Sequence, residues 1–174
     1  MILGIDPGKS GGYVFLDDSG NIFDSLIAPV TKDKKIDIEG IDCWLKFHKS
    51  ICAVTCVIEE VHSVFSSSAK SNFAFGYSVG IIPALLIANG LTDIVYVSPK
   101  NWQALSVKGI DKIEKTVNGK VKKDTKAMAA VAFRNIFPDN VVSFMKTALG
   151  NKSKNLHDGI VDAALIAHWY KESK

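Results

Sequence analysis

The stretch that most constrains the fold is the beginning of the chain, MILGIDPGKSGG. Residues 2–5 form a short apolar run, which predicts a buried strand that stops at Asp6. Pro7 and Gly8 then break the run, and the glycine pair at 11–12 permits a tight turn into a second strand. A carboxylate fixed at the end of a central strand is costly unless it binds something, usually a cation. Asp6 is therefore either a cation ligand or a turn cap, and its neighbours alone do not decide between the two.

The rest of the chain alternates strand and helix patterns. Residues 108–122 are expected to form a loop or a hairpin that turns at Asn118-Gly119, and residues 150–155 a flexible basic loop. An antiparallel meander followed by buried strands that alternate with helices predicts a mixed, five-stranded α/β sheet in a single domain over residues 1–174. Further strands are predicted at 12–17, 22–28, 53–58 and 94–97, and helices at 38–49, 69–89, around Trp102, at 123–137 and at 156–170.

Three further carboxylates stand out beside Asp6. Glu59 ends the apolar run at 53–58, so a second buried strand also stops at an acid. Asp158 and Asp162 lie four residues apart on the last predicted helix, hence on one face. The helix dipole explains an acid at Asp158 but explains Asp162 poorly. If these four side chains converge, they form an oxygen-ligand site suited to Mg²⁺ or Mn²⁺, and a pair of such ions can drive phosphodiester hydrolysis.

The net charge of +3 conceals an uneven distribution. Residues 98–156 carry eleven lysines and one arginine against four acids, whereas residues 1–97 carry seven lysines against eleven acids. A basic region beside an acidic cluster suits a protein that handles phosphodiesters. A lysine-rich surface without any ligand is the alternative, and it is the commoner meaning of a charge run.

The composition also narrows the cellular setting. Cys43, Cys52 and Cys56 are few and lie among apolar residues, which predicts buried, reduced thiols rather than disulfides or a zinc site. No signal-peptide pattern and no apolar run of transmembrane length is evident, so no membrane partner is expected. Ser10 and the cysteines lack a His–Asp partner set, so a covalent nucleophile is not expected.

Three segments resemble the acidic motifs of the RuvC-type Holliday junction resolvases, which belong to the RNase H-like superfamily. They are GIDPG at 4–8, VIEE at 57–60 and HDGIVDA at 157–163, in the order and spacing of that family. The segment FAFGYSVG at 73–80 resembles the helix after the second motif, and KDTK at 123–126 resembles the basic helix before the last. The resemblance is to the phage and organelle-like branch, which places the protein in the cytoplasm of a prokaryotic or phage-infected cell, or in an organelle or viral factory.

The resemblance implies a role for each of these residues. Asp6, Glu59, Asp158 and Asp162 would hold two Mg²⁺ ions, with Mn²⁺ as a substitute, and Lys123 or Lys126 would stabilise the scissile phosphate. Glu60 points to the opposite strand face, and His157 is either a surface residue or an accessory one. A homodimer is expected, formed through the helix over residues 73–86. DNA contacts are expected from His62 or Phe65, which would stack on an unpaired base, and from Lys100 and Lys122.

The predicted activity is symmetric, metal-dependent hydrolysis of four-way DNA junctions that leaves 5′ phosphates without a covalent intermediate. Two alternatives keep the same acids: another RNase H-like nuclease acting on flaps, branched DNA or RNA, and a non-catalytic junction-binding module. An ATP-binding protein of the actin and sugar-kinase type shares the Asp-x-Gly turn, but that fold needs a second domain for which 174 residues are too few.

Overall fold

The computed structural model describes residues 1–48, 53–61, 68–141, 145–148 and 151–174, and it gives backbone only for 145–148 and 151–155. Its helices are α1 (Ile38–Phe47), α2 (Ala69–Ala88), α3 (Pro99–Ser106), α4 (Thr125–Ile136), a short 3₁₀ helix (Pro138–Asn140) and α5 (Asp158–Glu172). Its strands are β1 (Ile2–Asp6), β2 (Gly12–Leu16), β3 (Ile22–Ile27), β4 (Thr55–Glu59), β5 (Ile94–Val97), β6 (Glu114–Val117), β7 (Lys120–Lys123), β8 (Met145–Ala148) and β9 (Asn151–Leu156).

Five of these strands form one mixed sheet in the order β3-β2-β1-β4-β5. β1 pairs antiparallel with β2, and β2 with β3, whereas β4 pairs parallel with β1 and β5 parallel with β4. The predicted meander followed by parallel strands is therefore confirmed. β1 lies in the middle of the sheet beside β4, so the two strands that end in Asp6 and Glu59 are direct neighbours and run in the same direction.

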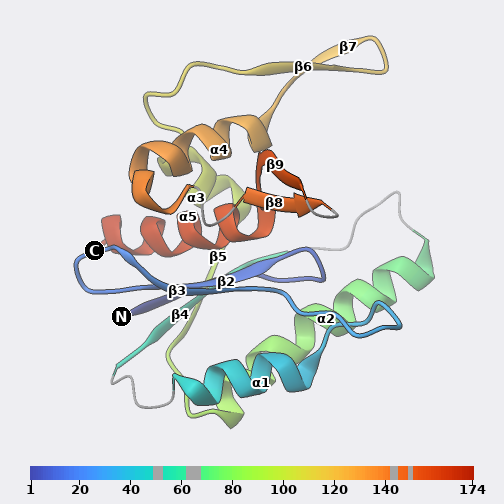
Figure 1. Cartoon of the computed structure of the whole chain (residues 1–174), viewed down its shortest axis with the longest axis vertical. Helices are drawn as coiled ribbons and strands as arrows, with labels where there is room; N and C mark the ends of the chain where they lie inside the picture. The colour runs from blue at the N-terminus through green and yellow to red at the C-terminus, as the bar shows by residue number, and fades with distance from the viewer. Residues whose placement is uncertain (49–52, 62–67, 142–144, 149–150) are drawn as a thin grey trace.

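The two faces of the sheet carry separate apolar clusters. α1 and α2 cover one face, and α3, α4 and α5 cover the other (Figure 1). Alternation along the strands divides the side chains: Leu3 and Ile5 of β1 pack on the α1 and α2 side, while Val57 of β4 packs on the α5 side. By the same alternation, Asp6 and Glu59 lie on the face that α5 covers.

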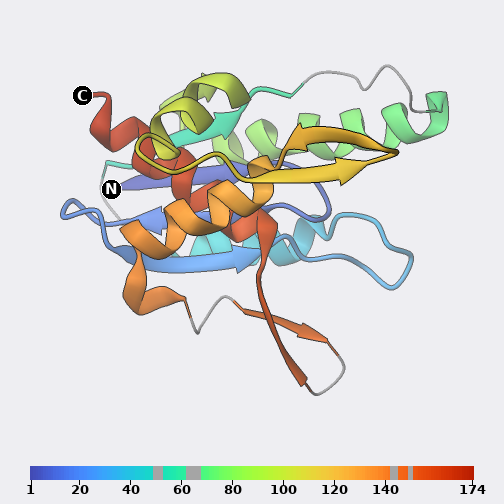
Figure 2. The same cartoon turned by 90° about the horizontal axis from the view of Figure 1, so that it is seen from above.

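Two hairpins stand outside this sheet. The β6–β7 hairpin turns at Asn118 and Gly119, both with positive φ (50° and 73°), as a two-residue type I′ turn requires. The hairpin alternative at 108–122 is therefore the one the structure adopts. The flexible loop expected at 150–155 is wrong, because most of that segment pairs with β8 as strand β9 (Figure 2). Its Asn and Lys residues have low strand propensity, but backbone pairing in a hairpin does not need apolar side chains.

Helix α2 is unusually exposed for so apolar a segment. It is long and apolar enough to cross a membrane by length and composition, although only 17% of the window that meets this test is buried, so the expectation that no apolar run reaches transmembrane length is wrong. Phe73 and Tyr77 are 78% and 52% exposed. The prediction of buried cysteines is correct for Cys56 and wrong for Cys43, which lies on the outer side of α1, and Cys52 is outside the described residues.

Candidate active site

Asp6 and Glu59 come together because β1 and β4 are adjacent parallel strands. The carboxyl ends of such strands meet at one edge of a sheet, so the last residue of each strand lies beside the other. Both side chains are partly buried, and the strands hold them without an intervening loop. Glu60, one residue beyond β4, is exposed.

Helix α5 brings two further carboxylates over this edge because glycines let it lie directly on the sheet. A Cβ on Gly4 of β1 would overlap the carbonyl oxygen of Ala163, and a Cβ on Gly12 of β2 would come within 2.8 Å of the Gly159 carbonyl oxygen. A Cβ on Gly159 itself would overlap the backbone at 10–11. Asp158 and Asp162 flank this contact on the first turns of α5, so backbone packing fixes their position.

The four carboxylates interact electrostatically. Burial, followed by the charges of Asp162 and Glu59, raises the pKa of Asp6 from 3.8 to about 8. Burial, then Glu59 and Asp158, raises the pKa of Asp162 from 3.8 to about 7. Burial also raises the pKa of Glu59. The carboxylates thus lie close together where they are partly shielded from solvent, and a bound cation would reduce the repulsion between them.

Lys126, on the first turn of α4, is the basic residue that reaches this cluster. Its Nζ lies 2.9 Å from Asp158 Oδ2, and its charge lowers the pKa of Asp6 and Asp162. The hydrogen bond from Lys126 to Asp158 raises the pKa of the lysine in turn. Both side chains are exposed to solvent, so the ion pair contributes little stability, roughly 0–1 kcal/mol. The pair does hold an ammonium group next to the carboxylate cluster.

The other predicted site residues within the described part of the chain lie on α3, on the β6–β7 hairpin and at the beginning of α5. Lys123 ends β7 and is exposed, with no ion pair to an acid in the described part of the chain, so the structure brings Lys126 rather than Lys123 to the carboxylates. Lys100 is exposed at the beginning of α3, and Lys122 is exposed on the β6–β7 hairpin. His157 is the N-cap of α5, where its Nδ1 accepts a hydrogen bond from the Ile160 N–H. His62 and Phe65 lie outside the described residues.

Trp102 is a site residue that the sequence did not indicate. Its indole N–H donates a 2.8 Å hydrogen bond to Glu59 Oε1, and the ring is buried at 1% exposure. This bond opposes the rise in the Glu59 pKa. The signal available in the sequence was a lone tryptophan shortly after β5, the strand next to β4, but nothing in that spacing identifies its partner. Trp102 is a positioning residue for the Glu59 carboxylate.

We expect Trp102→Phe to weaken the binding of a divalent cation without unfolding the chain. Phenylalanine retains most of the buried ring but removes the donor, so Glu59 loses its fixed orientation and its pKa rises further. Losing a partner of this kind reduces metal affinity or activity by about 10–100-fold. The measurement is the melting temperature against Mg²⁺ concentration, and recovery of the Mg²⁺ response at high concentration distinguishes a positioning defect from misfolding. Trp44→Phe, which removes the indole donor to Asp24 on the other face of the sheet, is the matched control.

The carboxylate cluster fits a hard divalent cation by its donor chemistry. It offers oxygen ligands only, and mutually repelling carboxylates in a partly buried place favour a hard dication over a metal that prefers thiolate or imidazole ligands, such as zinc. Within the described residues, no three His, Cys, Asp or Glu side chains lie close enough together to form a ready ligand set.

The raised pKa values give a pH and metal dependence of stability. Between about pH 4 and pH 8 the folded chain binds more protons at Asp6 and Asp162 than the unfolded chain does, so stability falls as the pH rises through this window. In EDTA we expect the free energy of unfolding to fall by an amount on the order of a few kcal/mol from pH 5 to pH 9. Excess Mg²⁺ should restore it more at pH 8 than at pH 5, because ligands must be deprotonated. Thermal melts check this, and a melting temperature indifferent to Mg²⁺ at pH 8 would contradict it.

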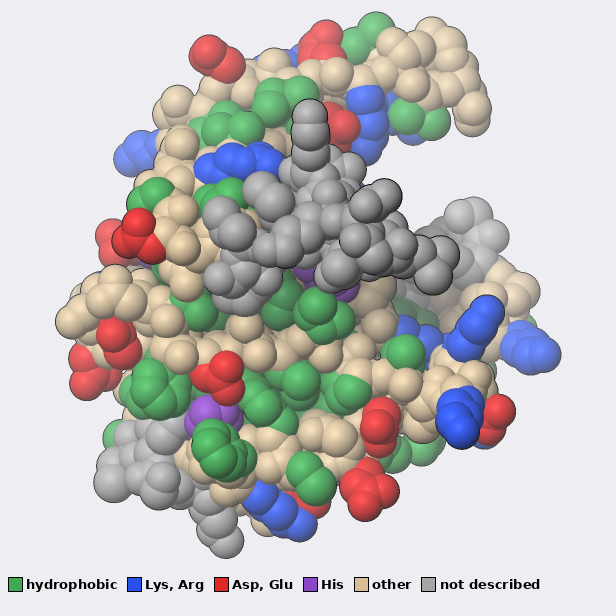
Figure 3. Space-filling model, in the orientation of Figure 1, with side chains coloured by type: hydrophobic (Ala, Val, Ile, Leu, Met, Phe, Trp, Pro, Cys, Tyr) green, Lys and Arg blue, Asp and Glu red, His purple; other side chains and the backbone are tan. Residues whose placement is uncertain are grey.

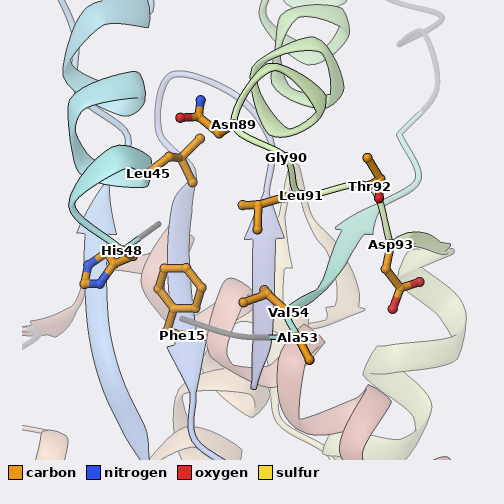
Figure 4. Close-up of a pocket in the computed structure, with 10 residues that line it drawn as sticks. All are labelled: Phe15, Leu45, His48, Ala53, Val54, Asn89, Gly90, Leu91, Thr92 and Asp93. Atoms are coloured by element: carbon orange, nitrogen blue, oxygen red, sulfur yellow. The ribbon is translucent and has the colours of Figure 1, made fainter. Parts of the chain in front are cut away.

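A separate cavity of about 390 Å³ lies at the opposite edge of the sheet. Val54 precedes β4 and Asp93 precedes β5, so this cavity lies at the beginning of the parallel strands, and none of the four carboxylates lines it (Figure 4). His48 at its rim bonds to Asp24 at 2.7 Å, which ties α1 to β3. Its residues therefore belong to the packing of the α1 side rather than to the acidic cluster.

Comparisons with known proteins agree with this architecture. No protein-family model and no curated protein matches the sequence. Among solved structures, Thermus thermophilus RuvC in complex with a Holliday junction substrate is 14% identical over 99% of this chain and 94% of that chain, with a TM-score of 0.58. A second Thermus thermophilus RuvC structure is 14% identical over 99% and 95%, with a TM-score of 0.57. At this identity the likeness establishes the fold, and the chain has the RuvC-type, RNase H-like arrangement of a mixed sheet flanked by helices.

Proposed function

We propose that this protein is a divalent-metal-dependent endonuclease that resolves four-way DNA junctions. The observation that carries the proposal is the meeting of Asp6, Glu59, Asp158 and Asp162 at one edge of the sheet. The fold shared with a RuvC bound to a Holliday junction substrate supports the choice of substrate. The phage or organelle-like branch and the cytoplasmic location stay predictions.

The residues divide the chemistry between them. Asp6, Glu59, Asp158 and Asp162 would hold Mg²⁺, and Trp102 would keep the Glu59 carboxylate in place. Bound divalent ions supply charge stabilisation and make water a better nucleophile. Water attacks the phosphorus, the bond from phosphorus to the 3′ oxygen breaks, and that oxygen takes up a proton, so a 5′ phosphate remains. The Lys126 ammonium, held at the cluster by Asp158, is placed to stabilise negative charge on the phosphate.

A homodimer through α2 is the second part of the proposal. Phe73, Tyr77 and Ile87 are all more than half exposed on this helix. Its glycines, Gly76 and Gly80, have no atom within 4 Å of where a Cβ would lie, so their close-approach surface is open in the described monomer. An exposed apolar face of this kind needs a partner, and a junction that is cut on two strands requires two active sites.

We expect Phe73→Asp to convert the dimer into a monomer. A charge at the centre of an apolar interface costs at least about 2 kcal/mol, which weakens association roughly thirtyfold or more. Light scattering after size-exclusion chromatography measures the mass. Phe47→Asp, at an equally exposed phenylalanine on α1 (81%), is the control and should leave the dimer intact. A dimer that survives Phe73→Asp would remove α2 as the interface.

The test of the activity is a substrate panel. A synthetic four-way junction, a flap and a linear duplex of the same sequences are incubated with Mg²⁺ or Mn²⁺. Paired symmetric nicks in the junction alone support a resolvase, and equal cutting of flap or duplex supports a general nuclease of this fold. Tight junction binding without cutting in either metal supports a binding module. ATP binding without DNA binding would overturn all three.

A further inference from the structure

The hairpin from Lys112 to Lys123, termed here the lysine arm, contributes no residue to either of the two apolar clusters found among the described residues. β6 and β7 pair only with each other, and every residue of both strands is exposed. Figure 1 shows the hairpin standing clear of α4, on the side away from the five-stranded sheet. The preformed turn at Asn118-Gly119 keeps the arm extended. An ordered projection without a core is available to a partner.

The register of the arm places lysines where stability disfavours them. Lys115 is directly opposite Lys122, and Lys120 is opposite Val117 on the same face. Like charges directly across an antiparallel pair are destabilising. Lys112 and Lys115 have acidic partners, Glu114 and Asp124, but Lys120, Lys122 and Lys123 have no ion pair within the described residues. The free positive charge is therefore concentrated toward the tip and along β7.

The base of the arm is joined to the active site. Lys115 Nζ lies 3.1 Å from Asp124 Oδ1, and Asp124 caps α4 by accepting a hydrogen bond from the Ala127 N–H. Lys126, which contacts Asp158, follows two residues after that cap. The N-terminal end of α4 thus connects the arm to the carboxylate cluster. Lysine or arginine side chains lie beside acidic ones where the arm meets the body of the protein (Figure 3).

A groove of about 550 Å³ connects the two places. Lys115, Lys126 and Arg134 line it together with Asp124 and Asp158. A smaller recess, lined by Lys126, Asp158 and Asp162, continues it into the carboxylate cluster. The groove therefore runs from the acids to the base of the arm. Its lining carries one more cation than acids, because Lys115 and Lys126 are paired with Asp124 and Asp158 and Arg134 has no ion pair within the described residues.

We propose that the lysine arm grips the sugar-phosphate backbone of DNA outside the cut site, and that the groove along α4 carries the strand from the four carboxylates to the arm. The identification of the polyanion as DNA rests on the proposed function. The carboxylate cluster repels a phosphate chain, so a nuclease of this design needs cations elsewhere along the bound strand, and the arm supplies them outside the cut site. Contacts of this kind fix position without reading sequence.

The test uses Lys120→Gln/Lys122→Gln in the Asp6→Asn background, so that binding is measured without cutting. Lys108→Gln/Lys174→Gln is the charge-matched control, because these exposed lysines lie beyond the ends of α3 and α5 that are far from the carboxylates. Junction and duplex affinities are measured against salt concentration. The arm variant should bind both DNAs about tenfold or more weakly at low salt, and the slope of log affinity against log salt should fall by roughly two. Its melting temperature should not fall, and a small rise is expected because Lys122→Gln removes the like-charge pair with Lys115.

The outcomes separate the arm from the activity. If the arm variant and the control bind DNA with equal affinity and equal salt dependence, the proposal that the arm contacts DNA is overturned, even if the wild type cuts junctions. If the arm variant binds both four-way and linear DNA more weakly but the wild type cuts no substrate, the arm is confirmed as a DNA contact and the proposed activity is overturned. Loss of binding to phosphatidylserine vesicles, with DNA binding intact, assigns the arm to a lipid surface and overturns it as a DNA contact.

Discussion

Asp6→Asn is expected to abolish DNA cleavage while making the metal-free protein more stable. The amide keeps the size of the side chain but removes the charge that a divalent cation needs, so the cleavage rate should fall at least about a thousandfold, beyond the 10–100-fold typical of residues that only support a metal ligand. At pH 8 in EDTA the same change removes an acid whose pKa is raised to about 8, and with it the repulsion among the carboxylates. The melting temperature should therefore rise and lose most of its response to Mg²⁺.

The prediction is specific because cleavage should fall while the melting temperature rises. A variant that loses activity because it unfolds would melt at a lower temperature. Glu60→Gln is the control, because this neighbour of Glu59 is exposed beyond the end of β4 and should retain full activity. Cleavage of the four-way junction by Asp6→Asn at close to the wild-type rate would show that the acidic cluster is not the reaction site.

Gly159→Ala is expected to be nearly as damaging, through geometry rather than charge. Its methyl group would overlap the backbone at 10–11, which no rotamer change can relieve, so α5 has to lift from the sheet. Forced overpacking of this kind costs about 1–3 kcal/mol of stability. Because Asp158 and Asp162 flank Gly159, the movement also displaces two carboxylates, and an error of about 1 Å in a catalytic group can cost a hundredfold in rate.

The matched control is the same substitution on another helix. Gly76→Ala on α2 meets no atom within 4 Å, and alanine favours a helix over glycine by about 1 kcal/mol, so at concentrations where the chain is monomeric its melting temperature should rise. Thermal melts compare the two variants, and junction cleavage is measured for Gly159→Ala against the wild type. Wild-type stability and rate in Gly159→Ala would mean that α5 is not held against β1 and β2 in the way described.

The sequence predicted the part of the site that depends on regular structure. Apolar runs that end at Asp6 and Glu59, and a four-residue spacing between Asp158 and Asp162, are local patterns, and the parallel pairing of β1 with β4 follows from strand order. The same reasoning located each main strand of the sheet to within about two residues, the usual uncertainty at strand ends.

Other features depend on contacts between distant residues, so the sequence could not supply them. Trp102 meets Glu59 across 43 positions of the chain, and Lys126 meets Asp158 across 32. Lys123 and Lys126 were indistinguishable as sequence because both fall in the first turn of the helix predicted at 123–137. The turn from β7 into α4 separates them, since it leaves Lys123 on the hairpin and places Lys126 on the helix. The β8–β9 hairpin lacks an apolar alternation that would have indicated strands.

The separation of the two apolar clusters by the sheet has a consequence for how such a protein tolerates change. The four carboxylates and Trp102 belong to the α5 face, while Leu3, Ile41 and Leu86 belong to the other. Substitutions behind the sheet therefore alter the fraction of folded molecules without altering the chemistry of each molecule. In a saturation mutagenesis experiment, lowering the temperature should rescue variants at the buried positions of the α1 and α2 face, and those at Gly4 and Gly159 should stay inactive. The sheet thus separates positions at which a lower temperature restores the activity of a variant from positions at which it does not.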